Sequence, residues 1–392
     1  MEKPTSSLLA LLFVPAAVLA CDADPPTEDV GTARVDDGPS RELPPDIRAD
    51  APAGWPVPRA AFGLDESGDL VVFDVDTGSV RAVHPLAWVI TDLCWDAHRQ
   101  RLLVVEKNGW VDGSRVHALR YDGQFVHESS SPALPGDVRV VVTGSRVLAV
   151  ADEYGTEWRE LDEHLEPRAG RAYTGLPASL YALGPSESPA VFALNARARV
   201  GSDSFDELFV LSDFGPEWMV GSVSHPKRPH TSSRVVFDAS SERSWLARLH
   251  PQGLDLFAVV KEGLAPAGAW VGVSSLGASL EGVAFDPDQE AVVLGVAHPA
   301  RPADELVLGA PGQAQPAVVV SLGGRLRRSP WFSRDVVLDS SGAVLLVATE
   351  RGIEAFRTTG TSHAPAVERA AGFDGAQLRG PVALREPASE SR

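Results

Sequence analysis

The chain has 392 residues, of which 44% are hydrophobic and 22% charged, and its formal net charge is −18. This composition excludes a mainly disordered chain, and the acidic balance argues against nucleic acid as a partner, because that needs a basic surface. Two cysteines are too few for a disulfide scaffold or a cysteine-based zinc or iron–sulfur site.

The first twenty residues predict an export signal. A positively charged start is followed by an apolar stretch from Leu8 to Leu19, which is too short for an ordinary transmembrane helix. The stretch ends Val18-Leu19-Ala20-Cys21, which resembles the lipobox of bacterial lipoproteins. That resemblance implies cleavage before Cys21 and lipid attachment to its thiol. The alternative is cleavage by ordinary signal peptidase, which would release a secreted protein without an anchor.

Residues 21–58 predict a tether that would hold a folded domain off the membrane. They are rich in Pro, Asp, Glu and small residues, and paired prolines favour an extended, semi-stiff backbone; a disordered leader would have the same sequence. We therefore divide the chain into a signal peptide (1–20), a lipidated tether (21–58), a folded domain (59–387) and a tail (388–392). The expected location is the bacterial cell envelope, with a lipid anchor on the periplasmic or surface side.

From residue 59 onward the apolar residues come in short runs bounded by Gly, Asp, Ser or Pro, which is typical of strands. A strand that ends in an acidic turn and is followed by a second apolar strand recurs along the chain. The copies begin at Leu93–Asp96, Val235–Asp238, Val283–Asp286 and Val336–Asp339. The recurrence predicts six four-stranded units over 90–129, 134–172, 177–222, 232–270, 279–322 and 331–370.

The stretch 60–83 supplies only three strands, and the apolar residues Pro381–Leu384 could complete that set from the other end of the chain. Seven units would then average roughly 47 residues, close to the ~40–50 of a four-stranded propeller blade. One such sheet cannot cover its own apolar faces, whereas sheets packed in a circle can. The predicted fold is therefore an all-β propeller of seven blades, with the N- and C-terminal strands closing one blade; six or eight blades stay open.

The segments DLVVFDVDTGSV, LLVVEKNG, RVHALRYDG and VAFDPDQEAVVL resemble bacterial β-propellers of the YVTN, NHL and SMP-30-like kind, over about 330 residues. These features are common to many propellers and place the chain in no subfamily. Propellers include hydrolases, lyases, scaffolds and sensors, so the resemblance implies no single function.

The sequence contains few patterns that carry chemistry. Asp74–Gly78 has the composition of a calcium loop but lacks the glutamate of an EF-hand, so we expect a tight turn. By their resemblance to SMP-30-like lactonases, which hold a divalent ion with Glu, Asn and Asp, Glu281, Glu106 and Asn108 are candidate ligands. Asparagine is scarce, so we expect no cofactor, and a divalent metal such as calcium only under this alternative.

Cys94 and the tryptophans have simple expectations. Cys94 lies inside an apolar strand and is expected to be a buried, inert thiol. Trp88, Trp110 and Trp331 lie in or beside predicted loops and are weak ligand candidates.

Charge is unevenly distributed among the predicted loops. In a propeller, the loops between strands 2 and 3 and the loops between blades emerge on one face, and here that set is rich in Arg and His. The candidate ligand-binding residues of this basic face are Arg228, His230, Arg301, Arg325, Arg327 and Arg328. Guanidinium groups suit carboxylate, phosphate or sulfate partners. The alternative is that they are solvated and paired with acids such as Asp304 and Glu305.

These features favour a non-catalytic platform that binds an envelope protein or a polysaccharide and touches the membrane only through its lipid. No catalytic residue is assigned under this interpretation, and the oligomeric state is not predicted. The rival interpretation is a metal-dependent hydrolase, lactonase-like or a phosphoesterase, acting at the central channel. Acidic and Asn side chains converging on a metal would favour the enzyme, and a channel plugged by apolar side chains would favour the platform.

Overall fold

The computed structural model describes residues 59–385 except 87, 109–112, 144–145, 153–155, 177–179, 184–190, 201–202, 213–218, 227–231, 239–242, 251, 261–262, 274–277, 287–288, 328–335, 339–342 and 362. The predicted signal peptide, Cys21, the tether and the tail lie outside these residues. The chain divides into two units, Met1–Ala49 and Asp50–Arg392, and every described residue belongs to the second. No helix in the described part is long and apolar enough to cross a membrane.

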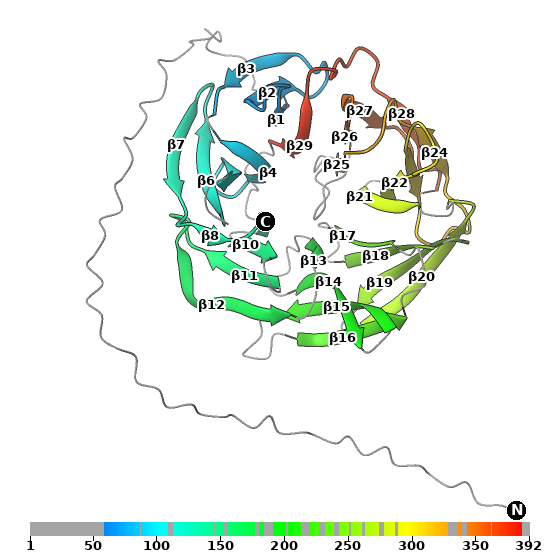
Figure 1. The fold of residues 1–392 in the computed structure, drawn as a ribbon. Coiled ribbons are helices and arrows are strands. Elements are labelled where there is room, and N and C mark those ends of the chain that lie inside the picture. Colours follow the sequence, from blue (N-terminus) through cyan, green and yellow to red (C-terminus); the bar gives the residue numbers. More distant parts are fainter. Residues whose placement is uncertain are drawn as a thin grey trace, which may run out of the picture. The chain divides into compact units, whose positions relative to one another are not determined.

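The described strands form seven antiparallel sheets, numbered here in chain order (Figure 1). Sheet 1 contains β1 (Ala60–Leu64), β2 (Leu70–Asp74), β3 (Val80–His84) and β29 (Arg379–Leu384). Sheet 2 contains β4 (Val89–Asp96), β5 (Arg101–Asn108), β6 (Gly113–Tyr121) and β7 (Phe125–Ser130), with β8 (Leu134–Pro135) paired to β6. Sheet 3 contains β9 (Val138–Thr143), β10 (Arg146–Asp152), β11 (Thr156–Leu161) and β12 (Pro167–Leu176).

The remaining four sheets repeat the same four-stranded order. Sheet 4 contains β13 (Leu180–Leu183), β14 (Val191–Val200), β15 (Asp203–Ser212) and β16 (Met219–Pro226). Sheet 5 contains β17 (Ser232–Asp238), β18 (Arg243–His250), β19 (Gly253–Val260) and β20 (Gly263–Val271). Sheet 6 contains β21 (Ser279–Asp286), β22 (Ala291–Ala297), β23 (Glu305–Gly309) and β24 (Val318–Ser321). Sheet 7 contains β25 (Val336–Leu338), β26 (Val344–Thr349), β27 (Gly352–Thr358) and β28 (Val367–Arg369).

The all-β prediction is confirmed, and the six predicted units correspond to sheets 2 to 7 with bounds that differ by a few residues. The C-terminal strand β29 pairs antiparallel with β1, so the two ends of the described chain share sheet 1. In Figure 1 the red strand β29 lies beside the blue strand β1.

The recurring acidic turn is a side-chain cap on the end of a strand. Asp96 ends β4, and its Oδ1 accepts the N–H of Arg99 at 3.1 Å. Asp286 ends β21, and its Oδ1 accepts the N–H of Gln289, also at 3.1 Å. Both carboxylates are fully buried. Aspartate favours turns because its side chain satisfies backbone N–H groups that the ladder has left unpaired, and this explains the motif in the sequence.

Asp74–Gly78 is a turn of the same type, as the sequence predicted. Asp74 Oδ1 accepts the N–H groups of Asp76 and Thr77, both at 2.9 Å, while Gly78 adopts a φ of 73°. Burial alone would raise the pKa of Asp74, but the two N–H groups and the Arg81 guanidinium hold it below its ordinary value.

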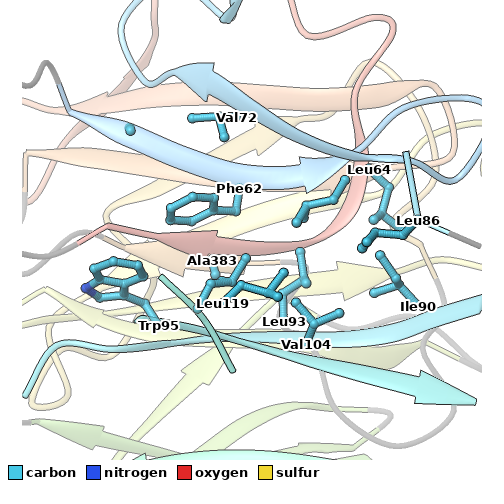
Figure 2. Close-up of a cluster of buried hydrophobic side chains, with 13 residues drawn as sticks. Phe62, Leu64, Val72, Leu86, Ile90, Leu93, Trp95, Val104, Leu119 and Ala383 are labelled. Carbon is cyan, nitrogen blue, oxygen red and sulfur yellow. The ribbon is translucent and has the colours of Figure 1, made fainter. Parts of the chain in front are cut away.

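Successive sheets bury their faces against each other. Along β1, Phe62 packs toward sheet 2 with Trp95 and Val104 (Figure 2). Its neighbour Ala61 packs toward sheet 7 with Leu346. Further cores join sheets 2 and 3, sheets 5 and 6, and sheets 6 and 7. Burial on both faces explains why β1 and β2 read as continuous apolar runs. Each fully buried large side chain contributes about 1.5 to 3 kcal/mol.

Cys94 is buried in the core between sheets 2 and 3, as expected. Its neighbour Trp95 faces the opposite way, into the core between sheets 1 and 2, where it stacks on Phe62 with ring centroids 5.4 Å apart. This alternation is that of a strand, in which successive side chains point to opposite faces.

Candidate functional site

A polar cluster lies on sheet 2 beside the core that sheets 1 and 2 share. Its members are Glu106 on β5, His117 on β6, and His127 and Ser130 on β7. In the strand register His117 is opposite Ser130 on one side and opposite Val104 on the other. Because alternate residues of a strand face the same side, His117 and Glu106 share the sheet face of Val104, which belongs to that core.

Glu106 and Ser130 bond opposite nitrogens of the His117 imidazole. Nε2 of His117 lies 3.0 Å from Glu106 Oε2, and Nδ1 lies 2.7 Å from Ser130 Oγ. An ionised carboxylate only accepts hydrogen bonds, so Nε2 carries the ring proton. In the neutral ring Nδ1 is then the acceptor, and the Ser130 hydroxyl donates to it. The result is a directed chain, which we call the relay, from the Ser130 hydroxyl through His117 to Glu106.

Burial keeps His117 in the neutral form that the relay needs. The residue is only 4% exposed, and the indole of Trp88, in the connector from β3 to β4, stacks on its ring with centroids 3.9 Å apart and planes 11° apart. Burial lowers the pKa of His117 below its ordinary value of 6.5, and the bond to Glu106 offsets only part of this. At neutral pH the imidazole is therefore uncharged and can accept a proton.

His127 contacts the same hydroxyl from the exposed side. Its Nε2 lies 2.7 Å from Ser130 Oγ. Because the single hydroxyl proton of Ser130 is donated to His117, the His127 ring must donate its N–H to the Ser130 oxygen. An N–H in this position stabilises negative charge that develops on the oxygen.

Ser129 gives an internal comparison for Ser130. Its Oγ is buried and has no hydrogen-bond partner. Ser129 pairs with Ala118 rather than His117, and neighbouring strand residues face opposite sides, so its side chain lies away from the relay. Two adjacent serines therefore differ in the one feature that matters for reactivity, which is contact with a base.

The basic residues predicted from the sequence are only partly described. Arg228, His230 and Arg328 lie outside the described residues. Arg301 is exposed, and its guanidinium forms an ion pair with Glu305, so for this residue the structure agrees with the alternative of pairing with nearby acids. Arg325 and Arg327 are half-buried on the connector from sheet 6 to sheet 7. Ligand binding by these residues stays a prediction.

Only one of the three candidate metal ligands, Glu106, has a described side chain. Glu106 bonds to His117, while the side chains of Glu281 and Asn108 lie outside the described residues, as do Trp110 and Trp331. Within the ranges given above, no group of three or more His, Cys, Asp or Glu side chains is placed to hold a metal ion. Of the loop tryptophans, Trp88 is described, and it belongs to the relay site.

Sequence reasoning missed His117, His127 and Ser130. Their segment, RVHALRYDGQFVHESS, was assigned to strands without a role for its polar residues. One signal was available: His117 stands in an apolar run between Val116 and Ala118, where a buried polar residue needs a partner. The partners themselves follow only from the register, which shifts between Ala118 and Leu119.

Comparison with known proteins identifies the fold of the chain but does not assign the chain to a family. No family model matches the chain, and no curated protein matches it. A solved structure from Bacteroides fragilis, provisionally named 6-phosphogluconolactonase, is similar with a TM-score of 0.58 and 12% identity over 85% of this chain and 99% of that one. Another from Bacteroides uniformis, with the same provisional name, has a TM-score of 0.56 and 12% identity over 83% and 99%. At this identity the likeness shows that the chain has the fold of these proteins.

Proposed function

We propose that this chain is a hydrolase that cleaves lactones or carboxylic esters, with Ser130 as nucleophile, His117 as general base and Glu106 as the group that orients the base. The observation that carries this proposal is the relay, in which one hydroxyl, one neutral imidazole and one carboxylate are hydrogen-bonded in sequence. The same three roles define the serine hydrolase arrangement on unrelated folds, where geometry rather than sequence position identifies it.

The proposed reaction uses only groups of the relay. Ser130 Oγ attacks the carbonyl carbon while its proton passes to His117 Nδ1, and the ring, now cationic, is stabilised by Glu106. His127 donates its N–H to the serine oxygen from the solvent side. His117 then returns the proton to the leaving alkoxide, which yields an acyl-Ser130 intermediate. In the second half, the same imidazole takes a proton from water, the hydroxide cleaves the acyl-Ser130 ester, and the ring returns the proton to Ser130 Oγ. One water is consumed. A lactone gives one hydroxy acid, and an open-chain ester gives an acid and an alcohol.

The provisional name of both structural neighbours supports a lactone as the substrate. A lactone is an intramolecular ester, and its hydrolysis needs the chemistry that the relay offers. The hydrolase that the sequence suggested was metal-dependent, whereas the hydrolase proposed from the structure uses the side chain of Ser130 as its nucleophile. The non-catalytic platform, which the sequence favoured, has no comparable observation in its support.

We also propose that the sheets close into a seven-bladed propeller of the SMP-30/NHL-like kind. Support comes from the pairing of β29 with β1 and from the shared cores that join neighbouring sheets. Export, cleavage before Cys21 and anchoring in the bacterial envelope stay proposals that rest on the lipobox resemblance. Binding to an envelope protein or a polysaccharide also stays a prediction.

Hydrolysis assays on the purified full chain test the proposed function. The substrates are gluconolactone, 6-phosphogluconolactone and short p-nitrophenyl esters, each measured with and without EDTA. We expect hydrolysis of at least one of them that survives EDTA, is abolished in Ser130→Ala and His117→Gln, and is kept in the matched control Ser129→Ala. Equal activity in Ser130→Ala and Ser129→Ala would overturn the assignment of the nucleophile. Activity that EDTA removes and calcium restores would favour the metal-dependent alternative.

A further inference from the structure

The segment that leads from sheet 6 into sheet 7 is fixed on both sides by backbone hydrogen bonds. The bonds run from Leu322 N to Asp304 O (2.9 Å), Asp304 N to Gly324 O (3.2 Å), Arg327 N to Ala348 O (3.3 Å) and Glu350 N to Arg325 O (2.8 Å). An isolated bridge also pairs Leu326 with Thr349. A connector held in this way presents its side chains from a rigid backbone, as a binding site requires.

Asp304 anchors the middle of this segment. Its carboxylate is fully buried, and it accepts the N–H of Leu326 at 2.7 Å and the N–H of His298 at 2.8 Å. Leu326 is itself fully buried in the core between sheets 6 and 7. Because side chains alternate along extended backbone, the flanking Arg325 and Arg327 project away from that core and to the same side.

Neither of these guanidinium groups has an ion-pair partner among the residues that the structure describes. Arg325 and Arg327 are half-buried. Among the ion pairs of the described residues, none includes either of them. By contrast, the guanidinium groups of Arg301, Arg357 and Arg369 each pair with an acid. Two cations without a described acidic partner on one rigid segment are unusual in a chain with a net charge of −18.

A third arginine lies against the same segment. A Cβ placed on Gly324 would be 3.1 Å from Cγ and 3.3 Å from Cδ of Arg351, so the Arg351 stem lies over this glycine. Arg351 also has no ion pair among the described residues. By the same alternation Gly324 faces the side of Leu326, so the Arg351 stem lies on the opposite side of the segment from Arg325 and Arg327.

We propose that Arg325 and Arg327 form a binding site for a divalent tetrahedral oxyanion, that is, a phosphate or sulfate group. Guanidinium groups bind such oxygens through paired, charge-assisted N–H bonds, and half-burial strengthens these bonds relative to water. The site is separate from the relay of sheet 2 and does not depend on the proposed hydrolase activity.

Glu350 is the acid placed to compete with the anion. It follows Thr349, the bridge partner of Leu326, and its N–H donates to Arg325 O, so it is opposite Arg325. Its side chain is exposed and forms no ion pair with that arginine in the described structure. A bound oxyanion must overcome repulsion from this carboxylate. Neutralising Glu350 should therefore increase the affinity for the anion.

Isothermal titration calorimetry of the full chain with inorganic phosphate and inorganic sulfate, at low ionic strength in chloride buffer, tests the site. We expect saturable binding of at least one anion, weakened about tenfold or more when Arg325→Gln and Arg327→Gln are combined. Glu350→Gln should tighten binding. The matched control is Arg357→Gln, which removes the same charge from an arginine that is already paired with Asp76.

Three results would overturn the proposal: no saturable binding of either anion to the parent chain, unchanged affinity in the double variant, or equal weakening by Arg357→Gln. A sugar phosphate and vesicles that contain phosphatidate then distinguish a soluble phosphomonoester from a lipid headgroup. Ser130→Ala should bind the anion like the parent, so failure of the hydrolase proposal and failure of this one are separable.

Discussion

Replacing Glu106 with glutamine tests the contact of the relay between Glu106 and His117. The side chains of His117 and Glu106 are 5% and 21% exposed, and the bond between them is 3.0 Å long. Glutamine has the same shape, but it offers an N–H as well as an oxygen. It no longer forces the proton onto Nε2, so Nδ1 loses its assured role as the acceptor of the Ser130 proton.

Two effects should appear together in Glu106→Gln. The hydrolysis rate should fall about 10²- to 10⁴-fold, the range of a general base, which corresponds to about 3 to 5 kcal/mol of barrier. Glu106 is also the group that raises the pKa of His117 against the effect of burial, so its loss should lower that pKa further. A base with a lower pKa stays unprotonated at lower pH, so the acid limb of the pH–rate profile should move to lower pH while the plateau falls.

The assay is kcat/KM against pH for the substrate that responds to Ser130→Ala, with the His117 ring titrated in parallel by NMR. The matched control is Glu305→Gln, which removes the same kind of contact, 2.9 Å long, from His298 in sheet 6. A rate loss no larger than that of this control, or a His117 pKa that rises, would refute the reasoning about the relay.

Four further substitutions have expected outcomes. Trp88→Ala should admit water to the stacked face of His117 and raise its pKa, which would move the acid limb of the pH–rate profile to higher pH. Phe62→Ala should lower the free energy of unfolding by about 3 to 5 kcal/mol in urea titrations, because its ring is fully buried against three aromatic neighbours. Ser129→Ala should raise the free energy of unfolding by about 1 kcal/mol, seen as a higher melting temperature in calorimetry, because it removes a buried hydroxyl without a partner. Asp304→Asn should cost about 1 to 3 kcal/mol in the same calorimetric measurement, because an amide cannot accept both backbone N–H groups from its two ends.

The sheets could be predicted from the sequence because their signals are local. Asp96 and Asp286 mark strand ends through bonds to residues only three positions away. The runs in β1 and β2 are apolar on both faces because each sheet is covered on both sides. The incomplete set at 60–83 pointed to a missing strand, and β29 supplies it.

The relay could not be predicted because it depends on register. His117 meets Ser130 only after the shift between Ala118 and Leu119, and the same shift sets His127 opposite Leu119. No pattern in the sequence specifies that irregularity. For Arg301 the sequence offered both ligand binding and pairing with Glu305, and the structure contains the ion pair with Glu305, which is only four positions away.

The sharing of sheet 1 by β1 and β29 also sets the order in which this protein can be completed during translation. The strand at Ala60–Leu64 leaves the ribosome roughly 15 to 60 s before its partner at Arg379–Leu384, given synthesis at about 5 to 20 residues per second. During that interval β1 has an open edge, which is a template for wrong pairing with other chains. A product that ends before Arg379 would keep that edge for its whole lifetime, so premature termination near the C-terminus should produce an aggregation-prone species rather than a slightly shortened protein.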